Sequence, residues 1–196
     1  ADNTSLPGSI TMVLFLGSLW GLAEALAGDA MRTLYPPLRA ALCTGLGMGI
    51  LGFGIGMNLP RRFLPAAAVV TAATMMLAVP LLQCSPLCRA NSALAVMLHG
   101  TMLAAALSPA WVRARNSMAA YGAAGFAAAL LSSMLFHYLG TRLAPCQYLL
   151  SFAGEGGMVR FIIKEGLLWA IFSAALLPLG VTLGRCYAER IDRARS

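Results

Sequence analysis

The chain has 196 residues, of which 59% are hydrophobic and only 11% are charged, and its mean hydropathy is +0.76. This composition is too apolar for an ordinary soluble domain of the same length, so the sequence predicts an integral membrane protein. The net charge of +7 does not indicate nucleic-acid binding, because the arginines stand singly between apolar runs instead of forming a basic face.

The apolar segments are rich in Ala, Gly, Leu and Met and poor in β-branched residues, which favours helices over a membrane barrel. A helix needs about 20 apolar residues to cross the bilayer, and Pro, Arg, Asn and Gly divide the chain into six such segments. We therefore expect an all-α polytopic membrane protein that forms a single transmembrane domain over residues 1–196. The expected spans are residues 9–28, 40–59, 63–82, 92–111, 117–139 and 158–184.

The arginines in the short connections predict the orientation of this bundle. The connections after the second and fourth spans and the C-terminal segment together hold Arg61, Arg62, Arg113, Arg115, Arg185, Arg190, Arg193 and Arg195. The connections on the opposite side hold Arg32, Arg39, Arg89 and Arg142. Because positive charge collects on the cytoplasmic side, we expect both termini in the cytoplasm, with a bacterial inner membrane as the location.

Small residues recur at helical spacing in the first two spans. Gly17, Gly21 and Ala25 lie four residues apart in the first span. The second span carries a similar stripe, made of Gly45, Gly49, Gly52 and Gly56. Such stripes let the backbone of another helix approach closely. Packing within the chain is the expected role, and docking of a second protein is the alternative.

Ionisable side chains inside the spans gather toward the outer end of the expected bundle. At about 1.5 Å of rise per residue, Glu24 lies about one turn inside the outer end of the first span, and His99 about two turns below the start of the fourth. Lys164 and Glu165 occupy the first two turns of the sixth span. Buried charge in lipid is costly and usually marks a functional site. Since the inner half holds no charge of comparable depth, the pattern predicts a pocket open to the outside rather than a proton or ion path.

Structural roles remain alternatives for several of these side chains. Arg160, near a helix end, can reach the headgroups, and His137 can be an interfacial histidine. Lys164 and Glu165 point about 100° apart, so each needs a partner on another helix. We expect Glu24 to pair with Lys164 across the bundle, and a structural ion pair explains this as well as a ligand site does.

Cys84, Cys88 and Cys146 fall in the expected outer connections. Thiols on an oxidising face tend to pair, so we expect a structural disulfide among these three cysteines. Thiol exchange with a quinone is the alternative. We expect no metal and no cofactor, because the two histidines lie at different depths and the methionines follow no repeated ligand spacing. The sequence favours a chain without catalysis but leaves that question open, and it has no HExxH, GxSxG or phosphate-binding glycine motif.

The layout of six spans with both termini inside, an outward pocket, and Gly17, Gly21 and Ala25 on one face of the first helix resembles the S components of energy-coupling-factor transporters. The resemblance implies that the chain captures a vitamin or trace metabolite outside the cell. It also implies that ATP hydrolysis belongs to partner subunits. The stripe on the first helix would then dock to a transmembrane coupling subunit.

The expected function is therefore capture of a small-molecule substrate for membrane uptake. The expected substrate contacts are Glu24, His99, Lys164 and Glu165 in the spans, with Arg32, Arg89, Arg142, Gln147 and Tyr148 in the connections. A zwitterionic or mildly acidic molecule fits a set that contains both Lys and Glu. Two other functions remain open: an outer-face thiol or metal redox subunit that uses the three outer cysteines, and a structural accessory subunit of a larger membrane complex.

Overall fold

The computed structural model describes residues 6–31, 35–77, 86–108, 117–143 and 145–195. Every regular element within these ranges is helical, which confirms the all-α prediction. The long helices are α1 (Leu6–Ala30), α2 (Pro36–Gly56), α3 (Leu64–Leu77), α4 (Pro86–Ala106), α6 (Met118–Leu143) and α9 (Leu167–Arg195). The short elements are the 3₁₀ turn η1 (Arg61–Phe63), α7 (Gln147–Leu150), α8 (Gly157–Phe161) and the π-helical segment η3 (Ile162–Gly166).

Four stretches of the described chain are long and apolar enough to cross a membrane. They are Leu6–Ala27, Pro36–Gly56, Met118–Leu143 and Gly157–Ala194. Helix α3 is not among them because only 14 of its residues lie in the described part of the chain. Helix α4 is long enough, but Arg89, Asn91 and His99 make it less apolar.

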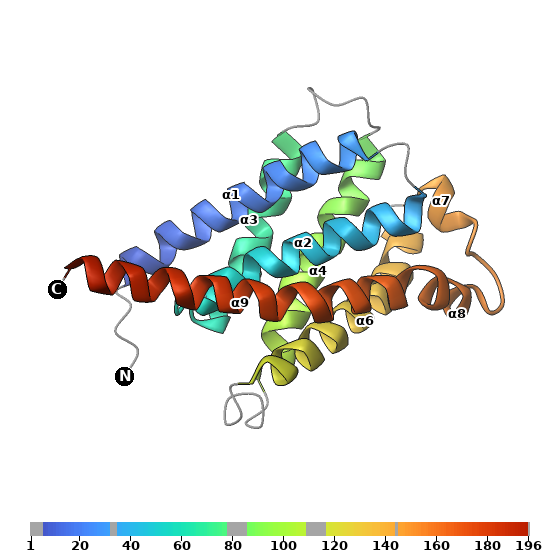
Figure 1. The fold of residues 1–196 in the computed structure, drawn as a ribbon. Coiled ribbons are helices and arrows are strands. Elements are labelled where there is room, and N and C mark those ends of the chain that lie inside the picture. Colours follow the sequence, from blue (N-terminus) through green and yellow to red (C-terminus); the bar gives the residue numbers. More distant parts are fainter. Residues whose placement is uncertain (1–5, 32–34, 78–85, 109–116, 144, 196) are drawn as a thin grey trace.

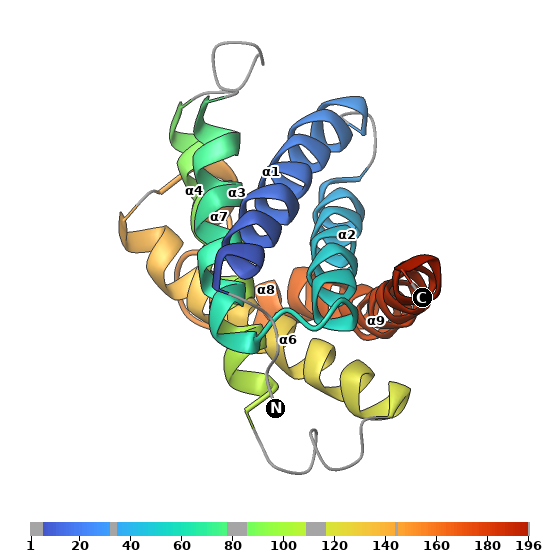
Figure 2. The ribbon, with the colours of Figure 1, turned by 90° about the vertical axis from the view of Figure 1, so that its left-hand side faces the viewer.

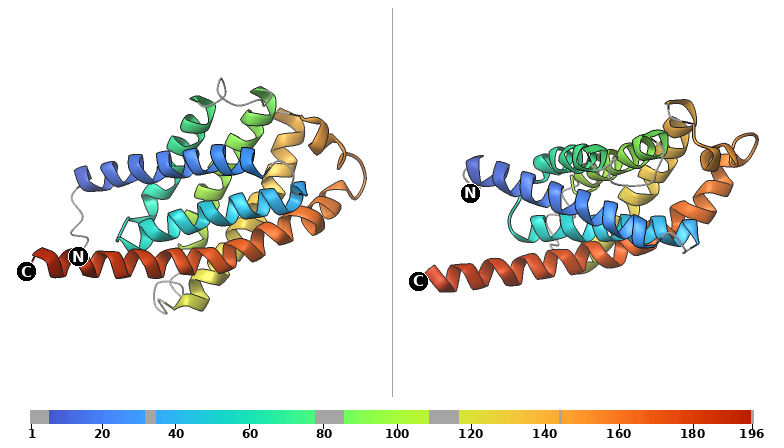
Figure 3. Two further views of the ribbon diagram at one scale, coloured as in Figure 1. Left: turned by 45° about the horizontal axis from the view of Figure 1, so that its top comes forward. Right: turned by 90° about the horizontal axis from the view of Figure 1, so that it is seen from above.

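The long helices form two layers that cross each other. Helices α1, α2 and α9 run side by side in one layer, and α3, α4 and α6 cross behind them (Figures 1 and 2). Helices α8, η3 and α9 form one continuous rod of 38 residues, and its C-terminal end extends past the other helices (Figure 3). At about 1.5 Å per residue this rod is much longer than the roughly 30 Å hydrocarbon core of a bilayer.

Glycines set the closest approaches between helices within the first layer. A Cβ atom added at Gly52 or Gly56 of α2 would collide with the backbone of α9 at Leu177 or Val181. The stripe that begins at Gly45 therefore packs inside the chain, because only Gly lets two helix backbones come this close.

The stripe on the first helix is covered as well. A Cβ atom at Gly17 would lie 2.6 Å from Val70 Cβ, and one at Gly21 would lie 2.6 Å from Thr74 Cβ, both on α3. The Thr71 hydroxyl of α3 also donates a 2.9 Å hydrogen bond to the Gly17 carbonyl oxygen. Helix α3 thus occupies the face that the resemblance assigned to a coupling subunit, which is the packing within the chain that the sequence also allowed.

These contacts fix the relative directions of the helices. Contacts of α1 with α3, and of α2 with α9, advance in the same direction along both chains, so each of these pairs is parallel. Gly122 packs against Ala174 whereas Gly166 packs against Ser133, so α6 and α9 are antiparallel. The six long helices therefore alternate in direction along the sequence, and α1 begins at the end of the bundle where α9 ends (Figure 1).

Candidate functional site

A cavity of about 380 Å³ opens at the end of the bundle where α1 and α6 end and α2 and α4 begin. Its lining comes from both layers, including residues of α1, α2, α4, α6, α7, α8, η3 and α9. The volume lies in the range of small-molecule sites, about 300–1,000 Å³. The polar and charged side chains that line it are Glu24, Arg39, Cys43, Thr44, Cys88, Arg89, Asn91, Ser92, His99, Cys146, Tyr148 and Glu165.

Two carboxyl groups in the cavity are each held by a tryptophan on the same helix. Trp20 Nε1 donates to Glu24 Oε1 at 3.2 Å, and Trp169 Nε1 donates to Glu165 Oε2 at 3.2 Å. Both pairs are four residues apart, which places their side chains on one helix face. In the first pair the tryptophan precedes the glutamate in the sequence, and in the second pair the glutamate precedes the tryptophan. Because α1 and α9 run in opposite directions, both carboxyl groups lie toward the same end of the bundle.

Glu165 is the most enclosed of these acids, with 1% of its surface exposed. It lies in the π-helical segment η3, and the Tyr148 hydroxyl of α7 donates to its other oxygen, Oε1. Single π turns inside α-helices occur frequently at functional sites. A buried acid that is oriented by two donors in such a turn is therefore a preorganised hydrogen-bond acceptor facing the cavity.

His99 presents a second acceptor. Its Nδ1 lies 2.6 Å from the Ala95 carbonyl oxygen, so Nδ1 carries the proton of the neutral ring and Nε2 is a bare acceptor. Nε2 is buried and has no hydrogen-bond partner in the described part of the chain, and the residue is only 2% exposed. The imidazole ring lies 5.3 Å from the indole of Trp169, measured between ring centroids, which places it beside the Glu165 pair.

Two arginines provide positive charge in the same cavity. Arg89 of α4 is 8% exposed, and its Nε atom is buried with no hydrogen-bond partner among the described residues. Arg89 interacts electrostatically with Glu24, and Arg39 of α2 does so with Glu165. The lining thus combines two acidic and two basic side chains, so a ligand need not carry a large net charge.

Aromatic rings form one wall of the cavity. Trp169 lies 5.7 Å from Phe136 and 5.9 Å from Phe161, measured between ring centroids, and all three line the cavity. Aromatic residues combined with a few placed polar groups are typical of small-molecule sites. The arrangement can hold a ligand with an apolar body and polar ends.

The structure brings together five of the nine side chains expected to contact a substrate. Glu24, Arg89, His99, Tyr148 and Glu165 all line the cavity. Of the remaining four, Lys164, Arg142 and Gln147 do not line the cavity and Arg32 lies outside the described residues.

Lys164 does not join this group. It is exposed on the surface, whereas its neighbour Glu165 is buried. The expected ion pair between Glu24 and Lys164 is not formed, because Glu24 instead accepts hydrogen bonds from Trp20 and Cys43. Adjacent helical residues point about 100° apart, so only one of this pair can face the cavity.

Two of the substrate contacts expected in the connections are not found in the cavity lining, and a third lies outside the described residues. Arg142 is exposed and its guanidinium lies 4.0 Å from the centre of the Tyr138 ring, to whose hydroxyl it also donates, away from the cavity lining. Gln147 is exposed and does not line the cavity either. Arg32 lies outside the described residues.

Other features of the sequence also have defined positions. The Nε2 atom of His137 lies 3.3 Å from the Phe152 carbonyl oxygen, which is a structural contact near the end of α6.

Cys146 carries a free thiol and is not joined to Cys88, so the expected disulfide between these two connections is not formed. Cys84 lies outside the described residues. The described residues contain no group of three or more His, Cys, Asp or Glu side chains arranged to hold a metal ion.

Sequence reasoning missed Trp20, Trp169, Arg39 and Cys43 as parts of the site. The two tryptophans had a usable signal, because each stands four residues from a membrane-embedded glutamate, the spacing of helix neighbours. Arg39 was counted only as a topological charge, although its place in the first turn of α2 brings it to the cavity. Cys43 lies one turn further along α2 and also lines the cavity.

The fold and the site together define an all-helical protein with long apolar helices and a polar cavity at one end of the bundle. No protein-family model, curated protein or solved structure matches this chain. The cavity itself is therefore the basis for a functional assignment.

Proposed function

We propose that this chain captures a small molecule in the cavity for uptake across a membrane and performs no catalysis. The observation that carries the proposal is a pair of buried atoms, His99 Nε2 and Arg89 Nε, that have no hydrogen-bond partner among the described residues and belong to residues that line the cavity. Leaving a buried polar group without a partner costs about 1–3 kcal/mol. A ligand that bonds to both atoms would recover that energy.

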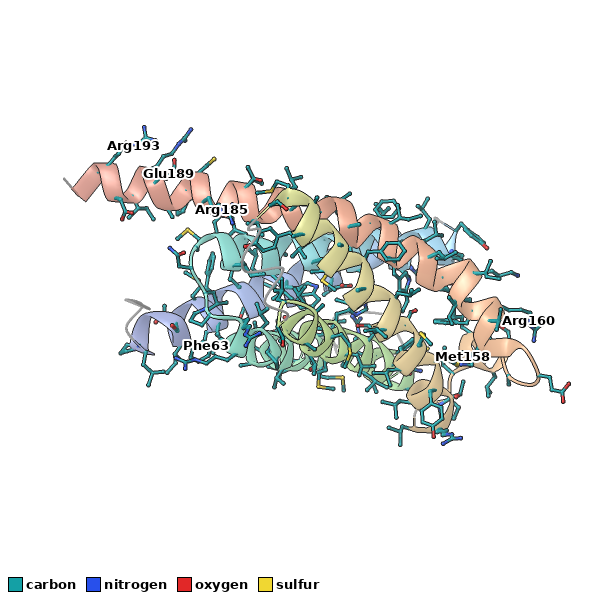
Figure 4. All side chains as sticks on the ribbon, turned by 90° about the horizontal axis from the view of Figure 1, so that it is seen from below. Phe63, Met158, Arg160, Arg185, Glu189 and Arg193 are labelled. Carbon is teal, nitrogen blue, oxygen red and sulfur yellow. The ribbon has the colours of Figure 1, made fainter. Side chains whose placement is uncertain are left out.

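The proposal includes six membrane spans, with α3 and α4 crossing in addition to the four long apolar stretches. The alternating directions of the six helices support this count. Arg61, Arg62 and Arg185 lie on elements at the end opposite the cavity, and Figure 4 places Arg185 and Arg193 far from Arg160 along the rod. Positive charge collects on the cytoplasmic side, so the cavity opens outward and both termini are cytoplasmic, in a bacterial inner membrane.

Uptake also needs a source of energy, and the described residues offer no nucleotide site. The proposal therefore includes partner subunits, as in the transporters that the layout resembles, in which a coupling subunit and ATPases drive delivery. Because α3 covers the stripe at Gly17 and Gly21, such a partner would contact other surfaces of this chain.

The test compares Glu165→Ala with Lys164→Ala, its exposed neighbour on the same turn. Each protein is purified gently, and small molecules released by organic extraction are measured by mass spectrometry. We expect one compound at near-stoichiometric amounts with the original protein and with Lys164→Ala, and its loss with Glu165→Ala. Cells that express the chain and its partners should accumulate that compound. Identical extracts from the original protein and Glu165→Ala would contradict the proposal.

Thiol redox chemistry is a second candidate because Cys43, Cys88 and Cys146 line the same cavity. In that case two thiols would be oxidised to a disulfide while a quinone of the membrane takes up two electrons and two protons. Thiol trapping in cells with and without quinone supply separates the two functions. Trapping that does not depend on quinone leaves substrate capture, whereas quinone-dependent cycling of these thiols would replace it.

A further inference from the structure

The two ends of the cavity need ligand groups with opposite hydrogen-bonding roles, a donor at one end and an acceptor at the other. His99 Nε2 and the oxygens of Glu165 accept hydrogen bonds, and both residues contact the Trp169 indole. A ligand must therefore donate at this end, through N–H or O–H.

The end of the cavity at Arg89 needs a hydrogen-bond acceptor from the ligand. An arginine guanidinium is always charged and has only donors, and burying such a charge without a partner is unfavourable. Glu24 is the electrostatic neighbour of Arg89, but the Nε atom of Arg89 is buried and has no hydrogen-bond partner among the described residues. A carboxylate or phosphate group on the ligand would meet the Arg89 guanidinium, which binds either with paired hydrogen bonds.

The distance between these ends limits the length of the ligand. Arg89 and His99 lie on the same helix, ten residues apart, which corresponds to roughly 15 Å along the axis. The two side chains differ by about 80° around the helix axis, and both line the cavity. Both residues line one cavity of about 380 Å³, which has room for one aromatic ring with substituents at opposite positions.

The cavity also suits a flat apolar body. Phe136, Phe161 and Trp169 line it beside His99 and Glu165. Aromatic pairs are stabilised beyond the burial of their area. A ring in the ligand would extend this cluster.

We infer that the cavity binds an aromatic molecule that presents an amino or ring N–H group to His99 and Glu165 and a carboxylate or phosphate to Arg89. This inference rests on the proposed function and assigns the chemical class and the direction of its substrate. The ligand lies along α4, with its anionic end toward the cavity mouth and its donor end toward Trp169.

The test uses four small probes that separate these features. They are 4-(aminomethyl)benzoate, which has both ends and the ring, benzylamine, 4-methylbenzoate and the ring-free 6-aminohexanoate. Binding to the detergent-purified protein is measured by calorimetry and by tryptophan fluorescence, because Trp20 and Trp169 line the cavity. We expect 4-(aminomethyl)benzoate to bind at least about tenfold tighter than each of the other three, since a hydrogen bond to a charged group contributes about 1.5–3 kcal/mol.

Variants then test the direction of binding. Arg89→Gln should weaken the binding of 4-methylbenzoate and of 4-(aminomethyl)benzoate about tenfold and leave the affinity for benzylamine unchanged. Glu165→Gln should weaken the binding of benzylamine and leave the affinity for 4-methylbenzoate unchanged. Lys164→Gln is the exposed control and should change none of them. The opposite pattern, or equal affinity for all probes, would overturn the inference.

Failure of this ligand class can be distinguished from failure of the proposed uptake function. A compound that co-purifies in a Glu165-dependent manner, together with no binding of any probe, would uphold capture and overturn this ligand class. End-specific binding of 4-(aminomethyl)benzoate in a protein that retains no compound and supports no uptake would uphold the ligand class and overturn uptake.

Discussion

Gly47 of α2 lies directly against the indole of Trp20 on α1, so closely that a Cβ atom at position 47 would overlap the ring. The same indole, 1% exposed, donates to the carboxyl group of Glu24. A glycine on one helix thereby makes room for the side chain that orients an acid on another.

Gly47→Ala should therefore destabilise the protein and disturb the Glu24 end of the cavity. Overpacking of this kind typically costs about 1–3 kcal/mol, and the added methyl group meets the body of a rigid ring. The thermal unfolding midpoint in detergent should fall by several degrees. Gly49→Ala is the matched control on the same helix, because its Cβ would lie at an ordinary 3.5 Å from the Leu176 carbonyl oxygen. Equal midpoints for the two variants would show that Trp20 is free to move.

The two hydrogen-bond donors to Glu165 can be removed one at a time by substitution. Trp169→Phe deletes the indole N–H and Tyr148→Phe deletes the hydroxyl, and each change leaves an aromatic ring in place. Loss of one such hydrogen bond costs about 1 kcal/mol, so each variant should bind 4-(aminomethyl)benzoate several-fold more weakly in calorimetry. Tyr187→Phe, exposed near the far end of α9, should bind as the original protein does. Unchanged affinity in both variants would mean that Glu165 does not need these donors.

The Thr71 hydroxyl connects α3 to α1 through the Gly17 carbonyl oxygen, and it also lies 3.0 Å from the Ala67 carbonyl oxygen of its own helix. Thr71→Val should lower the free energy of unfolding by about 1 kcal/mol, because a buried hydrogen bond between helices is lost. Denaturation in mixed micelles measures the difference. Thr101→Val provides the comparison, since the Thr101 hydroxyl is exposed and donates only to Met97 within α4. A larger loss at position 101 than at position 71 would argue against this role.

The orientation of the bundle can be tested with two native thiols. Cys146 lines the cavity and Cys186 is exposed near the end of α9, and both carry free thiols. In intact spheroplasts a membrane-impermeant maleimide should label Cys146 and spare Cys186, and it should label Cys186 after permeabilisation. Cys146→Ser and Cys186→Ser identify each signal. Labelling of Cys186 alone in intact spheroplasts would invert the topology, and the cavity would then face the cytoplasm.

The sequence was sufficient to predict the helical class and the gathering of Glu24, His99 and Glu165 at one end of the bundle. Ionisable groups are rare in apolar helices, so their depth along each helix is informative without knowledge of the packing. The partners of these groups were less predictable. The choice between Lys164 and Glu165 as the inward residue depends on the rotation of the last helix, which its neighbours determine.

The pairing of Glu24 was predicted wrongly for a related reason. A cross-bundle partner was expected because a buried charge needs compensation, but Trp20 on the same helix provides a neutral donor four residues away. The glycine stripe beginning at Gly17 had two readings in the sequence, and only the packing of α3 distinguishes them. Pairwise contacts between helices are not encoded in the periodicity of one helix.

The π-helical segment has a consequence for the phase of the last helix. Phe161 and Trp169 are eight residues apart, which in a regular α-helix would turn them about 80° away from each other. A π turn absorbs one additional residue, so the pair behaves as if seven residues apart and the two side chains differ by only about 20°. This is why both rings face the cavity and contact each other at 5.9 Å. The aromatic wall thus depends on the π turn. If these residues formed a regular α-helix of unchanged length, Phe161 would turn about 80° out of the wall, whereas deleting Ile163 would remove the extra residue and leave both rings aligned.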